Sequence, residues 1–258
     1  MAYTTIDNPE LYFQTKLYTG NGSSRSITLD GSENMQPDWV WIKSRSNAEP
    51  HVVFDSVRGA NKEIKTDENF AESTRTTGVT SFDSDGFSIG GLGALNENGY
   101  TFVAWNWKAG GSASSNSDGS TTTSISANTS SGFSIVSWTG TGSATTLGHG
   151  LNSKPEMIFI KNRDATQNWV VYNSYLSGTE GHKALYLDLN YAETDQTGFF
   201  NDTAATSSVF TVGSNGNTNN SGDDFIAYCF HSVKGYSKIG KWTGNGNADG
   251  PFVYTGFR

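Results

Sequence analysis

Short apolar stretches separated by polar turns run along the whole chain, and their alternation is of strand type rather than helix type. In the segment 38–43, two tryptophans share one face of a predicted strand, while a valine and an isoleucine share the other. Both faces are therefore apolar, as in an interior strand of a packed sandwich. Further strands are predicted at 51–54, 86–90 and 100–108. No segment has apolar residues at i, i+3, i+4 and i+7 over three turns, so the pattern predicts an all-β fold.

The second half of the chain repeats the first. Two of the repeated segments lie 155 − 37 = 118 and 169 − 51 = 118 residues apart, and the third lies 225 − 102 = 123 residues apart. The second copy therefore carries additional residues before its last strand, where loops of a sandwich tolerate length variation. A feature found in both copies is more typical of fold building than of chemistry. The paired segments are Pro37–Arg45 with Pro155–Arg163, His51–Phe54 with Trp169–Tyr172, and Phe102–Trp107 with Phe225–Phe230.

A third copy of the repeat begins near the end of the chain. The glycine-rich turn Tyr18–Gly22 returns as Trp138–Gly142 and once more as Trp242–Gly246. A chain built by copying one unit is typical of an assembly or binding protein.

We predict two tandem β-sandwich units, of jelly-roll or concanavalin-like type, at residues 1–111 and 132–235. The segment 112–131 consists of small and polar residues apart from Ile125. Such a segment buries little apolar area, so a linker is expected there, which can still lie along a surface as an extended strand. The partial third repeat at 236–258 is expected to pack on the second unit or on a neighbouring subunit.

Charge and cysteine content narrow the classes of function. Lys and Arg number 17 against 25 Asp and Glu, a formal net charge of −8, which disfavours a general affinity for nucleic acid or anionic membranes. Cys229 is the single cysteine, so we expect no internal disulfide, no zinc or iron–sulfur site and no cofactor. The N-terminus has no secretory signal pattern, and no apolar stretch approaches membrane-spanning length, so cytoplasmic synthesis without membrane insertion is expected.

One acidic cluster has the spacing of a metal-binding loop. Asp83 and Asp85, followed by glycine, match the start of a calcium loop, but no glutamate follows at the required distance. A polar turn between two strands is the favoured interpretation, and the two aspartates are weak candidates for an opportunistic calcium site.

Aromatic residues are the other candidates for a site. Four tryptophans of the first unit are replaced by large apolar residues in the second, which indicates a role in the core. Trp138 and Trp242 flank glycine-rich turns and are weak ligand-binding candidates. The four histidines lie in dissimilar contexts and none follows a nucleophile motif, so no catalytic residue is predicted. The replaced pairs are Trp39 with Met157, Trp41 with Phe159, Trp105 with Tyr228, and Trp107 with Phe230.

Several long segments resemble a repeat found in structural proteins of tailed bacteriophages, notably phages of marine bacteria. The likeness covers almost the whole chain. The segments that carry it are Tyr12–Gly22, Pro37–Lys43, Phe54–Gly59, Ser81–Phe87 and Phe102–Gly111 in the first copy, Phe133–Gly142 and Gly148–Leu151 in the second, and Gly235–Lys238 and Asp249–Arg258 in the third.

This resemblance implies a virion protein on the outside of the particle: a tail fibre, a receptor-binding appendage or a capsid decoration protein. It implies no catalytic residues. In similar proteins the third repeat continues past the position of Arg258. The expected partners are other virion proteins, further copies of the same chain (a trimer in a fibre) and host surface glycans.

Two alternatives stay open at this point. A lectin-like carbohydrate-binding module would use polar loop tips together with Trp138 or Trp242. A polysaccharide-degrading enzyme is the remote alternative, and it would need two carboxylates roughly 5–10 Å apart in a cleft.

Overall fold

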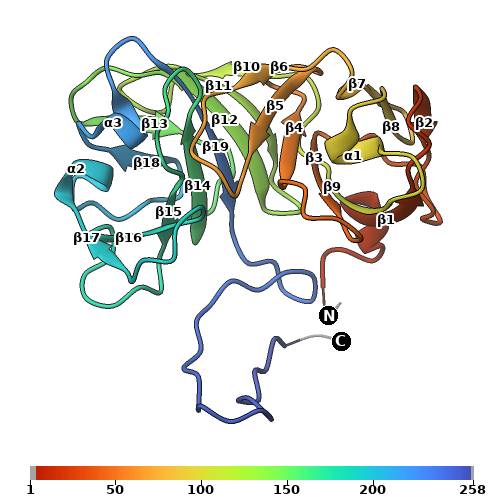
Figure 1. Cartoon of the computed structure of the whole chain (residues 1–258). Coiled ribbons are helices and arrows are strands. Elements are labelled where there is room, and N and C mark those ends of the chain that lie inside the picture. Colours follow the sequence, from red (N-terminus) through yellow and green to blue (C-terminus); the bar gives the residue numbers. More distant parts are fainter. Residues whose placement is uncertain (1–3, 257–258) are drawn as a thin grey trace.

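The structure, a computed structural model, describes residues 4–256 and is almost entirely β, which confirms the predicted fold class. Residues 1–3 of the first predicted unit and residues 257–258 of the third repeat lie outside the described residues. The strands form two large antiparallel sheets and two small ones. We call the part from η1 to β9 unit one and the part from β10 to β19 unit two; Figure 1 shows them side by side, with the C-terminal segment below both.

Unit one combines a six-stranded sheet with a three-stranded sheet and two short helical turns. The large sheet has, in spatial order, β1 (Phe13–Thr19), β9 (Thr101–Trp107), β3 (Trp39–Ser44), β4 (Val52–Asp55), β5 (Lys62–Lys65) and β6 (Ser73–Thr74). The small sheet has β2 (Arg25–Ile27), β8 (Gly86–Ile89) and β7 (Val79–Asp83), and the helical turns are η1 (Pro9–Leu11) and α1 (Gly93–Asn96).

Unit two repeats this plan with a wider sheet. The large sheet has, in spatial order, β10 (Ser114–Asn116), β11 (Thr123–Asn128), β12 (Phe133–Thr139), β19 (Asp224–Phe230), β14 (Met157–Asn162), β15 (Val170–Asn173), β16 (Lys183–Tyr186) and β17 (Thr194–Asp195). The small sheet has β13 (Thr145–Gly148) and β18 (Val209–Val212), and the short helices are α2 (Thr197–Phe200) and α3 (Gly216–Asn219).

The two apolar faces of each central strand have different partners. In β3, Val40 and Ile42 belong to the core between the large and the small sheet of unit one. Trp39, on the opposite face, belongs to a third core that contains residues of both units, among them Tyr228. The large sheets therefore pack on each other, and each small sheet covers an outer face. The sequence pattern identified both faces correctly, because a strand buried on both sides alternates between two apolar surroundings.

The segment 112–131, expected to be a linker that can lie along a surface as an extended strand, contributes two strands to the large sheet of unit two. β11 pairs with β12 from Ser124↔Ser137 to Asn128↔Phe133, and β10 pairs with β11. The hydroxyl of Ser126 is buried and accepts a hydrogen bond from Gly110 N at 2.9 Å. A polar segment can join an existing sheet because backbone hydrogen bonds and satisfied hydroxyls hold it without a large apolar area.

The repeated Thr-Gly turns have a steric reason for their glycines. A Cβ at Gly20 would lie 2.1 Å from the carbonyl oxygen of Glu97, and a Cβ at Gly140 would lie 2.0 Å from that of Asn220. Both distances are far shorter than any allowed contact, so only glycine fits where the turn meets the loop before the last strand.

The C-terminal segment begins folded against the units and then runs free of regular structure. Tyr236 packs edge-on against Tyr12 with ring centroids 6.2 Å apart, and Ile239 N donates to Ser232 Oγ at 3.0 Å. From 240 to 256 the segment has no helix or strand and is mostly exposed. Among residues 4–256 no helix is long and apolar enough to cross a membrane.

A buried asparagine closes the same loop in each unit. Asn96, at the end of α1, donates from Nδ2 to the carbonyl oxygens of Ser23 and Gly90, both at 2.8 Å. Asn219, at the end of α3, does the same toward Ser143 at 2.7 Å and Gly213 at 2.8 Å. Both side chains are fully buried, so these hydrogen bonds replace those that the side-chain amides would otherwise make with water.

We expect the substitutions Asn96→Ala and Asn219→Ala each to lower the free energy of unfolding by about 2–3 kcal/mol, because each leaves buried carbonyl groups without partners. Urea denaturation would measure this. Asn98→Ala is the matched control: Asn98 is exposed in the same loop, and its loss should change stability by less than about 0.5 kcal/mol. Equal stability of Asn96→Ala and Asn98→Ala would contradict this stabilising role of the buried asparagine.

Candidate functional site

The interface between the units is centred on Trp39, which is 1% exposed. Its indole stacks on Tyr228 of unit two at 4.3 Å between centroids and lies 4.5 Å from Trp107 of its own unit. Trp169 of unit two, also fully buried, donates from Nε1 to the carbonyl oxygen of Lys65 at 2.7 Å. Large aromatic rings from both sheets thus fill the space between them and exclude water from the interface.

A buried ion pair lies beside this aromatic core. Asp55 and Arg58, at the end of β4, form a salt bridge in which neither side chain is exposed. The hydroxyl of Tyr228 reaches across from β19 and donates to Asp55 Oδ2 at 2.7 Å. Burial alone would lower the pKa of Arg58, but the charge and hydrogen bond of Asp55, together with the contributions of Tyr228 and Glu72, outweigh it and hold that pKa above its ordinary value. Arg58 is therefore charged, and unit two supplies a hydrogen bond to its partner Asp55.

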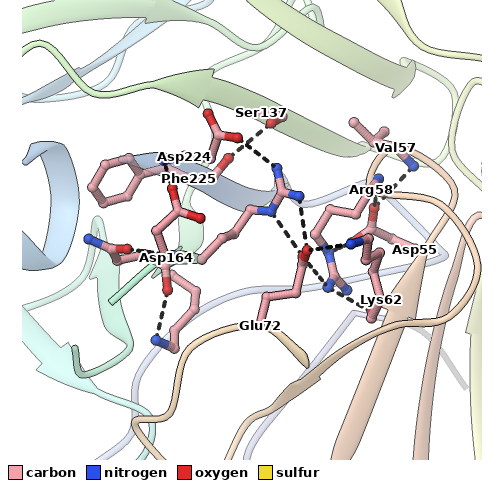
Figure 2. A network of polar contacts seen from close by, with 12 residues as sticks. Asp55, Val57, Arg58, Lys62, Glu72, Ser137, Asp164, Asp224 and Phe225 are labelled. Atoms are coloured by element: carbon pink, nitrogen blue, oxygen red, sulfur yellow. Dashed lines mark hydrogen bonds and ion pairs between the residues drawn. The ribbon is translucent and has the colours of Figure 1, made fainter. Parts of the chain in front are cut away.

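Glu72 extends the ionic network across the interface. Its Oε2 accepts from Arg58 Nη1 at 3.1 Å and from Arg163 Nε at 3.0 Å, and its Oε1 accepts from Arg163 Nη2 at 3.1 Å. The backbone joins the same residues, because Glu72 N donates to the carbonyl oxygen of Arg163 at 2.8 Å. Figure 2 shows Arg58 reaching toward both Asp55 and Glu72. One carboxylate of unit one is therefore clamped between an arginine from each unit.

Lys161 is a further polar group buried at the interface. Its Nζ donates to the carbonyl oxygens of Asn162 at 2.8 Å and, in unit one, of Asn69 at 3.2 Å. Burial lowers its pKa to about 8, and the charge of Asp188 opposes this shift. Sequence reasoning missed this group, although its repeat counterpart Lys43 was a signal that the position belongs to the fold.

A pocket of about 410 Å³ lies at the edge of the interface. Trp41 and Trp107 of unit one and Phe159 and Phe230 of unit two line it, together with residues 236–239. All four of these aromatic side chains are half-buried, so part of each ring faces the pocket rather than the core. The volume falls within the range of small-molecule sites, roughly 300–1,000 Å³.

The structure separates the two tryptophans that the sequence offered as ligand-binding candidates. Trp138 is 3% exposed and stacks on Phe225 at 5.3 Å, with Phe210 edge-on at 6.0 Å. This burial contradicts a ligand-binding role for Trp138, which belongs to the core of unit two. Trp242 is 64% exposed, and its role stays a prediction.

Asp83 and Asp85 each have hydrogen-bond partners within unit one. The carboxylate of Asp83 accepts from the hydroxyls of Ser81 and Ser88, both at 2.7 Å, and Asp85 Oδ1 accepts from Met35 N at 3.3 Å. These contacts support the interpretation of a polar turn that joins β7 and β8, with its carboxylates holding neighbouring backbone and hydroxyl groups.

A different group of possible metal ligands was not predicted. His182, Asp195 and Asp202 have ligand atoms within 4.8 Å of one another, the one such group among residues 4–256. They come from the residue before β16, from β17 and from the turn after α2, and they are partly or fully exposed. Proximity of this kind is common among exposed acidic groups, so it defines no metal site by itself.

Two other histidines are explained by packing. His51 Nδ1 accepts a hydrogen bond from Trp41 Nε1 at 3.1 Å. His149 is fully buried, and burial lowers its pKa to about 4, which keeps the ring neutral. Its Nδ1 accepts from Leu151 N at 3.2 Å. Both rings therefore accept hydrogen bonds from neighbouring groups and stabilise the local structure.

Comparison with known proteins gives a family without a described activity. A family model described as a domain of unknown function (DUF7483) matches residues 8–258. No curated protein and no solved structure matches the chain. The matched span covers both units and the C-terminal segment, so the likeness extends over the whole architecture.

The clamp on Glu72 predicts a dependence of stability on pH. Burial alone would raise the pKa of Glu72, but the hydrogen bonds and charges of Arg163 and Arg58 together outweigh it, so the pKa lies below its ordinary 4.5. A carboxyl group with a lowered folded-state pKa stabilises the fold above its unfolded-state pKa and loses this contribution as pH falls through the folded-state value. We expect Glu72→Gln to lower the free energy of unfolding by about 2 kcal/mol at pH 7.

This difference from the wild type should shrink as the pH falls below about 4.5, where the wild-type carboxylate takes up its proton. Urea denaturation at several pH values would measure it, with the exposed Glu97→Gln as the matched control. A constant difference between wild type and Glu72→Gln from pH 7 to pH 3 would contradict the clamp.

Proposed function

The chain belongs to the DUF7483 family, and we propose that it is a non-catalytic structural protein on the exterior of a bacteriophage virion. The observation that carries the proposal concerns the segments that resemble the phage repeat. They contain Trp39 and Trp107, which belong to or pack against the core between the units, and Asp55 and Arg58, which hydrogen-bond with Tyr228 of unit two. These residues of the phage-like segments therefore hold the two repeats against each other.

Rigidity of this kind suits a protein that is loaded mechanically outside a particle. Face-to-face packing of the large sheets buries the surfaces along which two separate sandwiches would bend. The net charge of −8 supports a place away from the genome, because an acidic surface repels nucleic acid phosphate. A tail fibre, a receptor-binding appendage and a capsid decoration protein are the three positions that fit.

Contacts with other virion proteins and with further copies of the chain are part of the proposal. The C-terminal segment exposes Trp242, Phe252 and Tyr254 by 64%, 91% and 78% of their surface. Exposed large aromatic side chains are typical of protein–protein contacts. A trimer is the expected assembly if the protein forms a fibre.

Electron microscopy of purified particles, labelled with a gold-conjugated antibody raised against this protein, would test the proposal. We expect label on the outside of intact particles, without prior disruption, and peptides of the protein in the mass spectrum of the same particles. Label confined to the lysate, with particles free of the protein, would contradict a virion location.

A lectin-like carbohydrate-binding module is the second candidate, and the aromatic pocket between the units favours it. It is compatible with the first, since an external virion protein can bind host glycans. A polysaccharide-degrading enzyme is the remote alternative. It would require two facing carboxylates, and the residues lining this pocket, all within the described part of the chain, include none.

A further inference from the structure

The first strand of unit one, β1, lies at an open edge of its large sheet. It pairs with β9 in continuous register over seven residues, and no strand among residues 4–256 pairs with its other side. The other outer strands of the two large sheets, β6, β10 and β17, have only two or three residues each. Short edge strands protect a sheet against pairing with another chain, because they leave few backbone groups free. β1 lacks this protection.

The hydrogen-bond pattern shows which residues of β1 face the open side. Gly20 N, directly after the strand, donates to the carbonyl oxygen of Tyr100 at 2.7 Å. In an antiparallel pair, every second residue turns its N–H and C=O groups toward the same neighbour. The even-numbered residues of β1 therefore bond with β9, whereas Thr15, Leu17 and Thr19 turn their backbone groups outward. All three are exposed, and Leu17 is exposed by 55% of its surface.

Unit two shows how the same edge can be filled. The counterpart of β1 is β12, at 133 − 13 = 120 residues, and β12 pairs with β19 on one side and antiparallel with β11 on the other. Ile135, at the position of Thr15, is fully buried there. By contrast, residues 4–12 ahead of β1 contain the turn η1 and no strand. The fold therefore accommodates a further antiparallel strand at this edge, and the described part of unit one supplies none.

The sequence of β1 suits pairing with a second copy of itself. Two identical strands that pair antiparallel are related by a two-fold axis. With Leu17 on the axis, this exposed apolar side chain meets its own copy, and Thr15 lies opposite Thr19 of the second copy. Lys16 then stays out of register with its own copy and keeps its salt bridge with Asp30. A register with Lys16 on the axis would place two like charges opposite each other, which is destabilising.

We propose that the outer edge of β1 is a contact surface between two copies of this chain, which pair β1 against β1 in antiparallel orientation with Leu17 opposite Leu17. The large sheets of the two first units then continue into each other. The proposal rests on the part of the proposed function that expects contacts between copies, and it names the surface. A two-fold contact joins copies in pairs, so it would add to the trimer of a fibre and not produce it. A strand from a different protein is the competing occupant.

Disulfide trapping of the full chain would test the pairing. In Leu17→Cys the two thiols face each other across the axis with Cα atoms about 5.5 Å apart, which a disulfide can span. Thr15→Cys is the matched control on the same edge, because its two copies lie roughly 13 Å apart along the strands. Cys229, the native cysteine, is buried. We expect mild oxidation to give a covalent dimer with Leu17→Cys and none with Thr15→Cys.

Sedimentation equilibrium over a range of protein concentrations provides the second readout. The wild type should form a concentration-dependent dimer, because a contact of one strand is small. Leu17→Pro removes an outward N–H that β9 does not use, so the fold should stay intact, which circular dichroism would verify. It should weaken association at least about tenfold, since both copies lose a hydrogen-bond donor. Tyr191→Ala removes another exposed side chain, 64% exposed and in unit two, and should associate like the wild type.

A covalent dimer with Leu17→Cys, together with weaker association of Leu17→Pro, supports the proposal. A wild type that stays monomeric, a dimer that Leu17→Pro leaves unchanged, or trapping of Thr15→Cys in place of Leu17→Cys overturns it. A synthetic peptide with the β11 sequence, residues 121–130, probes the competing occupant. Binding of this peptide to a monomeric wild type would overturn self-pairing and assign the edge to a strand of another protein. The labelling of particles judges the virion location separately.

Discussion

Apolar side chains on both faces of the central strands are the constraint on which the rest of this structure depends. A small sheet can cover only one face of a large sheet, and the other face must be removed from water by something else. In β3 that second face carries Trp39, and in β19 it carries Tyr228. Each unit supplies the cover that the other lacks. Burial of such aromatic surfaces is the largest favourable contribution to folding, so the two units are expected to form one cooperative body.

Polar groups then decide how the two apolar faces are placed on each other. Hydrophobic packing is non-directional and would tolerate sliding, whereas hydrogen bonds to a fixed carboxylate would not. Tyr228 must reach Asp55, and Arg163 must reach Glu72, for the buried charges to be satisfied. Removing one partner of a buried ion pair costs more free energy than the intact pair contributes. The network therefore fixes how the two sheets are placed on each other more than it adds to the stability of the fold.

Much of the fold could be predicted from the sequence, because strand periodicity and duplication are local signals. The two faces of the segment 38–43 and the pairing of both copies followed from them. The contact between units did not follow, since a sequence shows that a face is apolar and not which surface covers it. For this reason Trp39 was predicted to be in a core, but its stacking on Tyr228 was not foreseen. The segment 112–131 was expected to be a linker that could lie extended along a surface. Its pairing into the large sheet did not follow from the sequence, because backbone pairing leaves little trace in composition.

The candidate site could not be predicted for the same reason, because a sequence does not show which surfaces come into contact. Trp138 and Trp242 occupy the same motif, yet Phe225 and Phe210 bury the first, whereas the second is 64% exposed. The residues that line the pocket between the units come from strands about a hundred residues apart in the chain, so no single segment could have predicted it. Asp55, Glu72 and Lys161 likewise each gain a hydrogen-bond partner from the other unit only when the two sheets meet.

The protein has an acidic composition and an aromatic pocket of about 410 Å³ where the two units meet. Both the proposed virion role and the carbohydrate-binding candidate rely on the two units acting as one. Differential scanning calorimetry tests that claim most directly. The account predicts a single unfolding transition in which the calorimetric and van't Hoff enthalpies agree. Two separate transitions, or a calorimetric enthalpy about twice the van't Hoff value, would show that the units unfold independently and would contradict it.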